Sequence, residues 1–196
     1  SAAGRHFIAI TDPGTALQAL AESKHYREVF VNPADIGGRF SALSLFGLVP
    51  CALIGADAGT LLAAGAAMAE GCKQENHANA GLALGAFIGA AALEGRDKLT
   101  LALPPSLASL GLWIEQLVAE STGKLGVGVV PIAGETLGPA EVYSNDRAFV
   151  RVRLNGSGED DAVARLESAG FPVATIDLPE PLALGAEFVR WEVATA

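Results

Sequence analysis

The sequence predicts an α/β protein, with a doubly wound, mainly parallel sheet between two layers of helices. Short apolar runs typical of buried strands alternate with longer stretches whose apolar residues recur at helical spacing. Turn residues such as Asp12-Pro13-Gly14 separate the two kinds of segment. Apolar residues make up 51% of the 196 residues, which is enough for a large core and disfavours disorder.

The chain begins with a strand–helix–strand unit, predicted at residues 5–11, 15–22 and 28–31. Two strands joined through one helix pair in parallel, because a parallel connection needs a crossover. Ligands of doubly wound sheets bind outside the carboxyl ends of the strands. The loops at residues 11–14 and 37–39 follow strand ends, so both are predicted at the ligand-binding edge.

The rest of the chain continues the alternation. Further helices are predicted at residues 42–55, 58–73, 77–94, 106–122, 159–168 and from 184 onward, and strands at 98–103, 127–131, 147–154 and 172–178. Ser106 is expected to cap its helix, and Gly123 to end it in the left-handed conformation. Residues 147–154 alternate with period two, which indicates an exposed or edge strand.

Composition and charge exclude several functions. The formal net charge is −9 and no basic cluster stands out, so a nucleic-acid partner is disfavoured. Cys51 and Cys72 lie in apolar helical stretches without metal-ligand spacing, and the three histidines form no His-x-x-x-His pair. These residues therefore give little support to a zinc site, and they favour a reduced, cytoplasmic setting.

Long uncharged stretches raise the question of a membrane span. Residues 40–56, 58–69 and 76–93 carry no Asp, Glu, Lys or Arg. They are rich in alanine and glycine, interrupted by Pro50 and Asp57, and lack flanking basic and aromatic belts. Closely packed core helices explain them better than membrane spans do.

The segment 32–44 carries the first candidate site. Gly37 and Gly38 follow a strand and precede Arg39 and a long apolar helix, which Ser41 or Ser44 could cap. Paired glycines allow unusual backbone torsions and the close approach of a ligand, and an arginine after such a turn can face an anion. A glycine turn with a surface arginine explains the local pattern equally well.

Glu120 is the second candidate. It lies one turn after Gln116 on the same helix face, just before the helix ends. A carboxylate there meets the unfavourable end of the helix dipole, which suits a group that exchanges protons near neutral pH. On spacing alone, a solvated glutamate at a helix end is the favoured explanation.

Two segments bring a family resemblance. Asp35-Ile-Gly-Gly-Arg-Phe-Ser-Ala-Leu-Ser44 resembles the first signature of glucose-6-phosphate isomerases, and Trp113-Ile-Glu-Gln-Leu-Val-Ala-Glu-Ser-Thr-Gly-Lys124 resembles the family helix that ends in Glu-Ser-x-Gly-Lys. Residues 7–14 resemble the strand that opens the second sugar-isomerase (SIS) subdomain. The sequence near Pro131 and near Phe188 is most similar to the isomerase part of bacterial transaldolase/phosphoglucose isomerase fusions.

The resemblance implies an SIS-type fold, a single SIS domain over residues 1–196 and a fragment truncated at both ends. It implies interconversion of glucose 6-phosphate and fructose 6-phosphate through a cis-enediolate. Glu120 would be the catalytic base, Arg39 would stabilise the enediolate, Gln116 would bind substrate, and the backbone of Gly37 and Gly38 would line the site. It implies no metal or cofactor, a phosphorylated hexose as ligand and a homodimer.

The sequence also departs from the family. The phosphate-binding Ser-Lys-Ser-Gly-Thr-Thr loop of the first SIS subdomain and the C-terminal Phe-Asp-Gln segment are absent, and no histidine follows Thr122. The ring-opening histidine of the family would fall near residues 146–148. We therefore expect the isolated chain to be inactive. A sugar-phosphate-binding SIS module without catalysis and a phosphoglucose/phosphomannose isomerase remain as alternatives.

Overall fold

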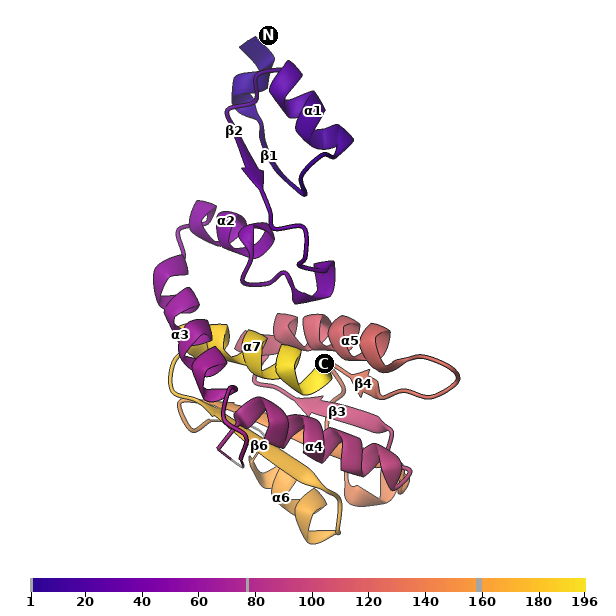
Figure 1. The fold of residues 1–196 in the computed structure, drawn as a ribbon. Helices are drawn as coiled ribbons and strands as arrows, with labels where there is room; N and C mark the ends of the chain where they lie inside the picture. The colour runs from indigo at the N-terminus through magenta and orange to yellow at the C-terminus, as the bar shows by residue number, and fades with distance from the viewer. Residues whose placement is uncertain (1, 77, 158–159) are drawn as a thin grey trace. The chain divides into compact units, whose positions relative to one another are not determined.

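The computed structural model describes residues 2–76, 78–157 and 160–196, and the chain divides into two units (Figure 1). Unit 1 is Ser1–Leu62 and unit 2 is Ala63–Ala196. Each contains a parallel sheet with flanking helices, which confirms the predicted fold class. The single domain expected over residues 1–196 stays a prediction, because a division by contacts does not test which parts fold independently.

In unit 1 a 3-10 helix at Ala2–His6 replaces the start of the strand predicted at 5–11, and the predicted strand–helix–strand unit follows it. Strand β1 (Ile8–Thr11), helix α1 (Ala16–Ser23) and strand β2 (Glu28–Val31) follow one another, and the two strands pair in parallel. Thr15 caps α1, because its hydroxyl oxygen accepts a hydrogen bond from the backbone N–H of Gln18. The parallel pairing places the carboxyl ends of β1 and β2 at the same edge of the sheet.

The segment after β2 is less regular than predicted. A 3-10 turn at Gly38–Phe40 precedes helix α2 (Leu45–Leu53), where the sequence predicted one helix over residues 42–55. Of the two serines proposed as caps, Ser44 fills the role: its Oγ accepts from the N–H of Phe46 at 3.2 Å. Helix α3 (Ala58–Gly71) follows and crosses the boundary between the units.

Unit 1 buries little apolar surface. Among its described residues, the buried apolar side chains are those of Ala9, Ala21 and Leu61. Large apolar side chains remain exposed on or next to both strands and the helices α1 and α2: Phe7, Ile8, Leu17, Leu20, Val31, Phe46, Leu53 and Ile54. Hydrophobic stabilisation scales with the apolar area removed from water, so this unit has a small share of the stabilising energy.

Unit 2 contains the larger sheet. Its elements are α4 (Ala80–Leu93), β3 (Lys98–Ala102), α5 (Ala108–Thr122), β4 (Val130–Ile132), β5 (Arg147–Leu154), α6 (Asp160–Ser168), β6 (Val173–Leu178) and α7 (Leu184–Thr195). The strands are parallel in the order β4-β3-β5-β6. The connections leave β3 and β5 in opposite directions, so right-handed crossovers place α5 and α6 on opposite faces (Figure 1).

Strand β5 lies inside this sheet, between β3 and β6, so the prediction of an exposed or edge strand is wrong. Ala148, Val150 and Val152 are fully buried. The arginines of this strand have hydrogen-bond and ion-pair partners that are distant in the sequence. Arg151 donates to the hydroxyl of Thr175 at 3.0 Å, and Arg153 makes a two-pronged ion pair with Asp177.

The ends of α5 and β4 also differ from the prediction. A 3-10 turn at Pro105–Leu107 precedes α5, so Ser106 does not cap it, and Gly123 has φ −72° rather than a left-handed torsion. Gly123 is required instead by space, because an added Cβ would lie 2.6 Å from the carbonyl oxygen of Ala119. Strand β4 is shorter than the predicted 127–131. His77 and Glu159, the predicted first residues of two helices, lie outside the described residues.

A buried carboxylate lies on α7. Glu187 is 2% exposed, and its Oε1 lies 3.2 Å from Nη2 of Arg190, with which it forms an ion pair. Within the described residues, its Oε2 and the indole Nε1 of Trp191 have no hydrogen-bond partner. Burial, partly offset by Arg190, raises the pKa of Glu187 to about 7. Burial also raises the pKa of the neighbouring Glu192 to about 7.

The small core of unit 1 predicts uneven protection of the backbone. We expect the amides of β1 and β2 to exchange with deuterium at least about tenfold faster than those of β5, because fewer buried contacts oppose local opening. Hydrogen-exchange mass spectrometry of the 196-residue chain measures this directly, with the edge strand β6 as the control for strand position. Equal protection of β1 and β5 would contradict it.

The buried Glu187 predicts a pH-dependent stability. Its pKa of about 7 in the folded chain exceeds the ordinary value of 4.5, so the folded state binds the proton more tightly. The resulting stabilisation is fully present below pH 4.5 and is lost as the pH rises through 7, by on the order of 3 kcal/mol. Glu187→Gln should flatten the free energy of unfolding between about pH 5 and pH 8.

Urea unfolding at several pH values measures this slope. The matched control is Glu167→Gln, which changes an exposed glutamate of the same unit. If the free energy of unfolding changes as steeply with pH in Glu187→Gln as it does in Glu167→Gln, Glu187 does not cause the pH dependence.

Candidate functional site

The first candidate site is the turn that carries Gly37, Gly38 and Arg39 in unit 1. It follows β2 on the edge where β1 also ends, as the strand order predicted. Arg39 is half-buried within the 3-10 turn, whereas both glycines are exposed. The backbone N–H of Phe40 donates to the carbonyl of Gly37 at 2.9 Å, which closes the turn.

Gly37 and Gly38 do not have the unusual torsions that a glycine pair permits. Gly37 has φ −70° and ψ 150°, an extended conformation open to any residue. A Cβ added to either glycine would meet nothing within 4 Å. Neither backbone geometry nor packing inside the described chain requires glycine here, which leaves the approach of an external group as a reason for the pair.

The second candidate site is on α5 in unit 2. Gln116 and Glu120 lie one turn apart on the exposed face of this helix. The opposite face is buried through Leu110, Ile114 and Leu117. This amphipathic pattern fixes the rotation of the helix about its axis, and so presents the two polar side chains together on its outer surface.

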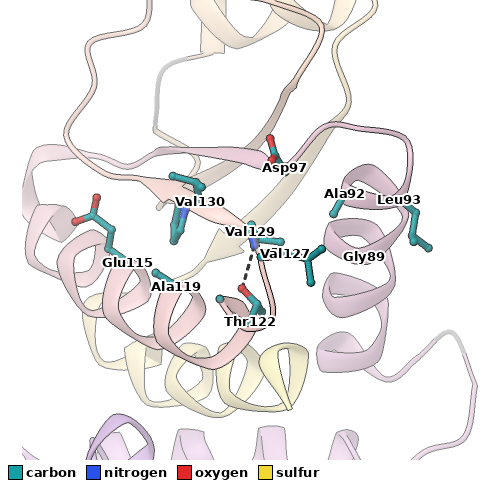
Figure 2. Close-up of a pocket in the computed structure, with 14 residues that line it drawn as sticks. Gly89, Ala92, Leu93, Asp97, Glu115, Ala119, Thr122, Val127, Val129 and Val130 are labelled. Atoms are coloured by element: carbon teal, nitrogen blue, oxygen red, sulfur yellow. Dashed lines mark hydrogen bonds between the residues drawn. The ribbon is translucent and has the colours of Figure 1, made fainter.

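The end of α5 is firmly held. The hydroxyl of Thr122 donates to the carbonyl of Val118 at 2.8 Å and accepts from the N–H of Val129 at 3.0 Å, the bond drawn in Figure 2. Lys124 and Val127 exchange two backbone hydrogen bonds across a tight turn. Glu120 therefore lies in the last turn of a helix whose end is fixed to the segment that leads into β4.

A large open cavity of about 1120 Å³ lies beside this helix end. Figure 2 shows Glu115, Ala119 and Thr122 of α5 on one side and Leu93 of α4 on the other. The lining is mainly apolar and does not include Gln116 or Glu120, which occupy the neighbouring face of α5. The cavity is therefore separate from the proton-transfer chemistry that the sequence suggested.

The structure brings the predicted residues together in two groups. Gly37, Gly38 and Arg39 form one turn in unit 1, and Gln116 and Glu120 share one helix face in unit 2. Each group is described within its own unit. The roles assigned to these residues stay predictions.

A third polar cluster was missed by the sequence reasoning. Nη1 of Arg147 lies 2.6 Å from Oε2 of Glu135 and donates to the hydroxyl of the fully buried Thr100 at 2.7 Å. The guanidinium also lies over the ring of Tyr143, 5.2 Å from its centre. These contacts tie the loop at 133–146 to the sheet. The signal available was Glu135, isolated in a glycine-containing loop and followed by the arginines of the next strand.

Arg147 occupies the region where the family resemblance placed a ring-opening histidine. Its guanidinium is committed to Glu135 and Thr100, and arginine keeps its proton at neutral pH. This cluster is suited to holding the loop rather than to moving protons.

In residues 2–76, 78–157 and 160–196, no group of three or more His, Cys, Asp or Glu side chains could hold a metal ion. No helix in the described part of the chain is both long and apolar enough to span a bilayer.

Comparisons with known proteins identify relatives of this chain. No protein-family model matches it. It is 43% identical over 136 residues to the glucose-6-phosphate isomerase of Heliobacterium modesticaldum, covering 65% of this chain and 29% of that one. It is 35% identical over 178 residues to a protein of Natronomonas pharaonis named "Probable glucose-6-phosphate isomerase", covering 87% and 39%.

A solved structure extends the likeness to the fold. The crystal structure of a hypothetical protein from Thermus thermophilus matches with a TM-score of 0.84 and 25% identity, covering 98% of this chain and 56% of that one. The chain is therefore related to a part of glucose-6-phosphate isomerases, and it spans less than two fifths of the length of the two isomerase relatives described above.

The open space at the glycine pair predicts that alanine is tolerated there. Gly37→Ala and Gly38→Ala should preserve or slow amide exchange in β1 and β2, since alanine at a compatible position stabilises by about 0.4–1 kcal/mol. The matched control is Gly47→Ala, whose Cβ would lie 1.9 Å from the carbonyl oxygen of Ala42 and should speed exchange. Faster exchange in both Gly37→Ala and Gly38→Ala would show that the fold itself needs these glycines.

Proposed function

We propose that this chain is part of a glucose-6-phosphate isomerase, which interconverts glucose 6-phosphate and fructose 6-phosphate. The observation that carries the proposal is the turn at Gly37, Gly38 and Arg39, whose glycines nothing inside the described chain requires. A turn of this kind lets a ligand approach the backbone beside a cation. The relationship to part of such isomerases supports the same function.

Glu120 is the proposed catalytic base. Its carboxylate removes the proton from C2 of the open-chain aldose, and the electron pair of that bond forms the C1–C2 double bond while O1 becomes the enediolate oxygen. Return of the proton to C1, with a proton moved from O2 to O1, gives the ketose. C1 is reduced and C2 is oxidised within one molecule, so no external oxidant, reductant or cofactor is needed.

Arg39 is proposed to stabilise the charge of the enediolate. A cation placed in advance near the developing oxyanion lowers the energy of the transition state more than that of the substrate. Gln116 is proposed to bind a substrate hydroxyl beside the base, with the backbone of Gly37 and Gly38 along the same substrate.

The complete enzyme is proposed to be longer than this chain, as its relatives are. The remainder would supply the phosphate-binding loop, the C-terminal segment and the group that opens the sugar ring. We propose a cytoplasmic homodimer acting in glycolysis and gluconeogenesis, with a transaldolase part on the same polypeptide as a further expectation. The isolated chain is expected to be inactive.

A non-catalytic alternative rests on Arg147. Where the family resemblance placed a ring-opening histidine, this arginine is tied to Glu135 at 2.6 Å. A chain without that acid–base group fits an SIS module that binds a sugar phosphate as a signal. A phosphoglucose/phosphomannose isomerase is the alternative within enzymes, and it would use the same base and the same arginine.

Substitution of the base separates these functions. In the full-length protein, Glu120→Gln should lower kcat for glucose 6-phosphate by roughly a hundred- to ten-thousand-fold, because the amide cannot accept the C2 proton. A coupled isomerase assay measures the rate, with mannose 6-phosphate as a second substrate. The matched control is Glu115→Gln, on the same helix, which should retain activity.

The results discriminate cleanly. Binding of glucose 6-phosphate without turnover by the unsubstituted protein would support the signalling module. Full activity of Glu120→Gln would remove Glu120 from the role of base, and turnover of mannose 6-phosphate would favour the broader isomerase.

A further inference from the structure

Arg39 lies in the segment between β2 and α2, residues 32–44, which is called the Arg39 segment below. The buried side chain of Asn32 ties this segment to the sheet. Asn32 directly follows β2 and is 1% exposed. Its Oδ1 accepts a hydrogen bond from the N–H of Leu45, the first residue of α2, at 3.2 Å. Its backbone N–H donates to the carbonyl of Thr11 at the end of β1 at 2.8 Å. One residue therefore joins the ends of both strands to the start of the helix.

A ladder of hydrogen bonds continues from the helix start to the turn. The hydroxyl of Ser44 donates to the carbonyl of Ser41 at 2.8 Å, and the hydroxyl of Ser41 donates to the carbonyl of Gly38 at 2.7 Å. Arg39 is the residue that follows this last carbonyl. The start of α2, held by Asn32, is thus connected through two serines to the backbone beside the arginine.

Gly47 provides a second, independent anchor. A Cβ on this residue would lie 1.9 Å from the carbonyl oxygen of Ala42 and 2.8 Å from its carbonyl carbon. Real Cβ contacts of this length do not occur, and backbone atoms cannot move aside as a flexible side chain can. The Arg39 segment therefore packs directly on the backbone of α2, at a point that only glycine allows.

Helix capping alone does not explain these contacts. Ser44 already caps α2 by accepting from Phe46. The close contact at Gly47 lies inside the helix, where alanine would favour the helical conformation more than glycine does. Both features make sense as constraints on the segment between β2 and α2. A charged group that stabilises a transition state must be held in place beforehand to be effective.

We propose that Asn32 and Gly47 are positioning residues for Arg39, an inference that rests on the proposed isomerase function. Asn32 fixes where the segment leaves the sheet, and Gly47 fixes how closely it lies on α2. Together they hold the turn at Gly37, Gly38 and Arg39 in one place relative to the strand ends. Neither side chain needs to touch the substrate for this effect.

The first test measures the segment without reference to activity. In the 196-residue chain, Asn32→Leu removes the acceptor for Leu45 and should speed amide exchange over residues 38–46 roughly tenfold. Asn32→Asp keeps an acceptor at the helix N-terminus and should restore most of the protection. The matched control is Thr11→Val, which removes a buried hydroxyl at the end of the neighbouring strand.

The second test asks whether the effect passes through Arg39. In the full-length protein, Asn32→Leu and Gly47→Ala should each lower kcat by roughly tenfold or more, measured per folded molecule, with a smaller change in KM. In an Arg39→Ala background, neither substitution should lower kcat further, because residues acting through one group are not additive. The control for an alanine in a helix is Gly89→Ala, whose Cβ meets nothing within 4 Å.

Separate results would overturn the two proposals. If Asn32→Leu and Thr11→Val leave residues 38–46 equally protected, Asn32 does not hold the segment. If the effects of Asn32→Leu and Gly47→Ala persist undiminished in the Arg39→Ala background, they act elsewhere. If the full-length protein isomerises no hexose phosphate, the proposed function fails, and the exchange experiment alone decides whether the segment is held as described.

Discussion

The parallel pairing of β1 with β2 is the constraint on which the candidate site depends. It directs both strand ends to one edge, so Thr11 and Asn32 become neighbours although a turn, a helix and a strand separate them in the sequence. From that edge the chain must reach α2, and the polar side chains on the way decide where Arg39 lies. The position of Arg39 therefore depends on backbone hydrogen bonds between two strands, and these bonds involve no charged side chain.

The two-stranded parallel sheet of unit 1 also leaves large apolar side chains exposed to solvent. Parallel sheets occur with both faces covered, usually by helices, and with more than two strands. Here the described strands and helices keep large apolar side chains in water, such as Phe7 and Ile54. The proteins to which this chain is related are longer, and the matched portion of each lies within that greater length.

Local patterns in the sequence were sufficient for the order and type of the elements. Alternation of apolar runs predicted the strands, and the crossover argument predicted the parallel pair in unit 1. Strand β5 lies inside the sheet although it carries arginines, because two of them form ion pairs with Glu135 and Asp177. Those partners depend on strand register and on a loop conformation, neither of which a local pattern encodes.

The candidate site divides in the same way. The spacing of Gln116 and Glu120 was sufficient to place them on one helix face, because helical periodicity is local. Unusual torsions were possible at Gly37 and Gly38, and the observed ones are ordinary, since glycine permits a conformation without imposing it. The hydrogen bond from Leu45 to the side chain of Asn32 could not be predicted, because an asparagine before a proline has the pattern of a turn residue. Its link to Leu45 spans 13 residues.

Pro131 gives strand β4 a property that concerns the outer border of the larger sheet. The N–H of Val130 donates inward to Asp97, so the next position, Pro131, is the one whose nitrogen points away from β3. Proline has no hydrogen there, and this border of the sheet cannot donate at its central residue. A strand from another molecule that tried to pair with β4 would find a donor missing at that point. The missing donor disfavours the edge-to-edge pairing of sheets that leads to aggregation.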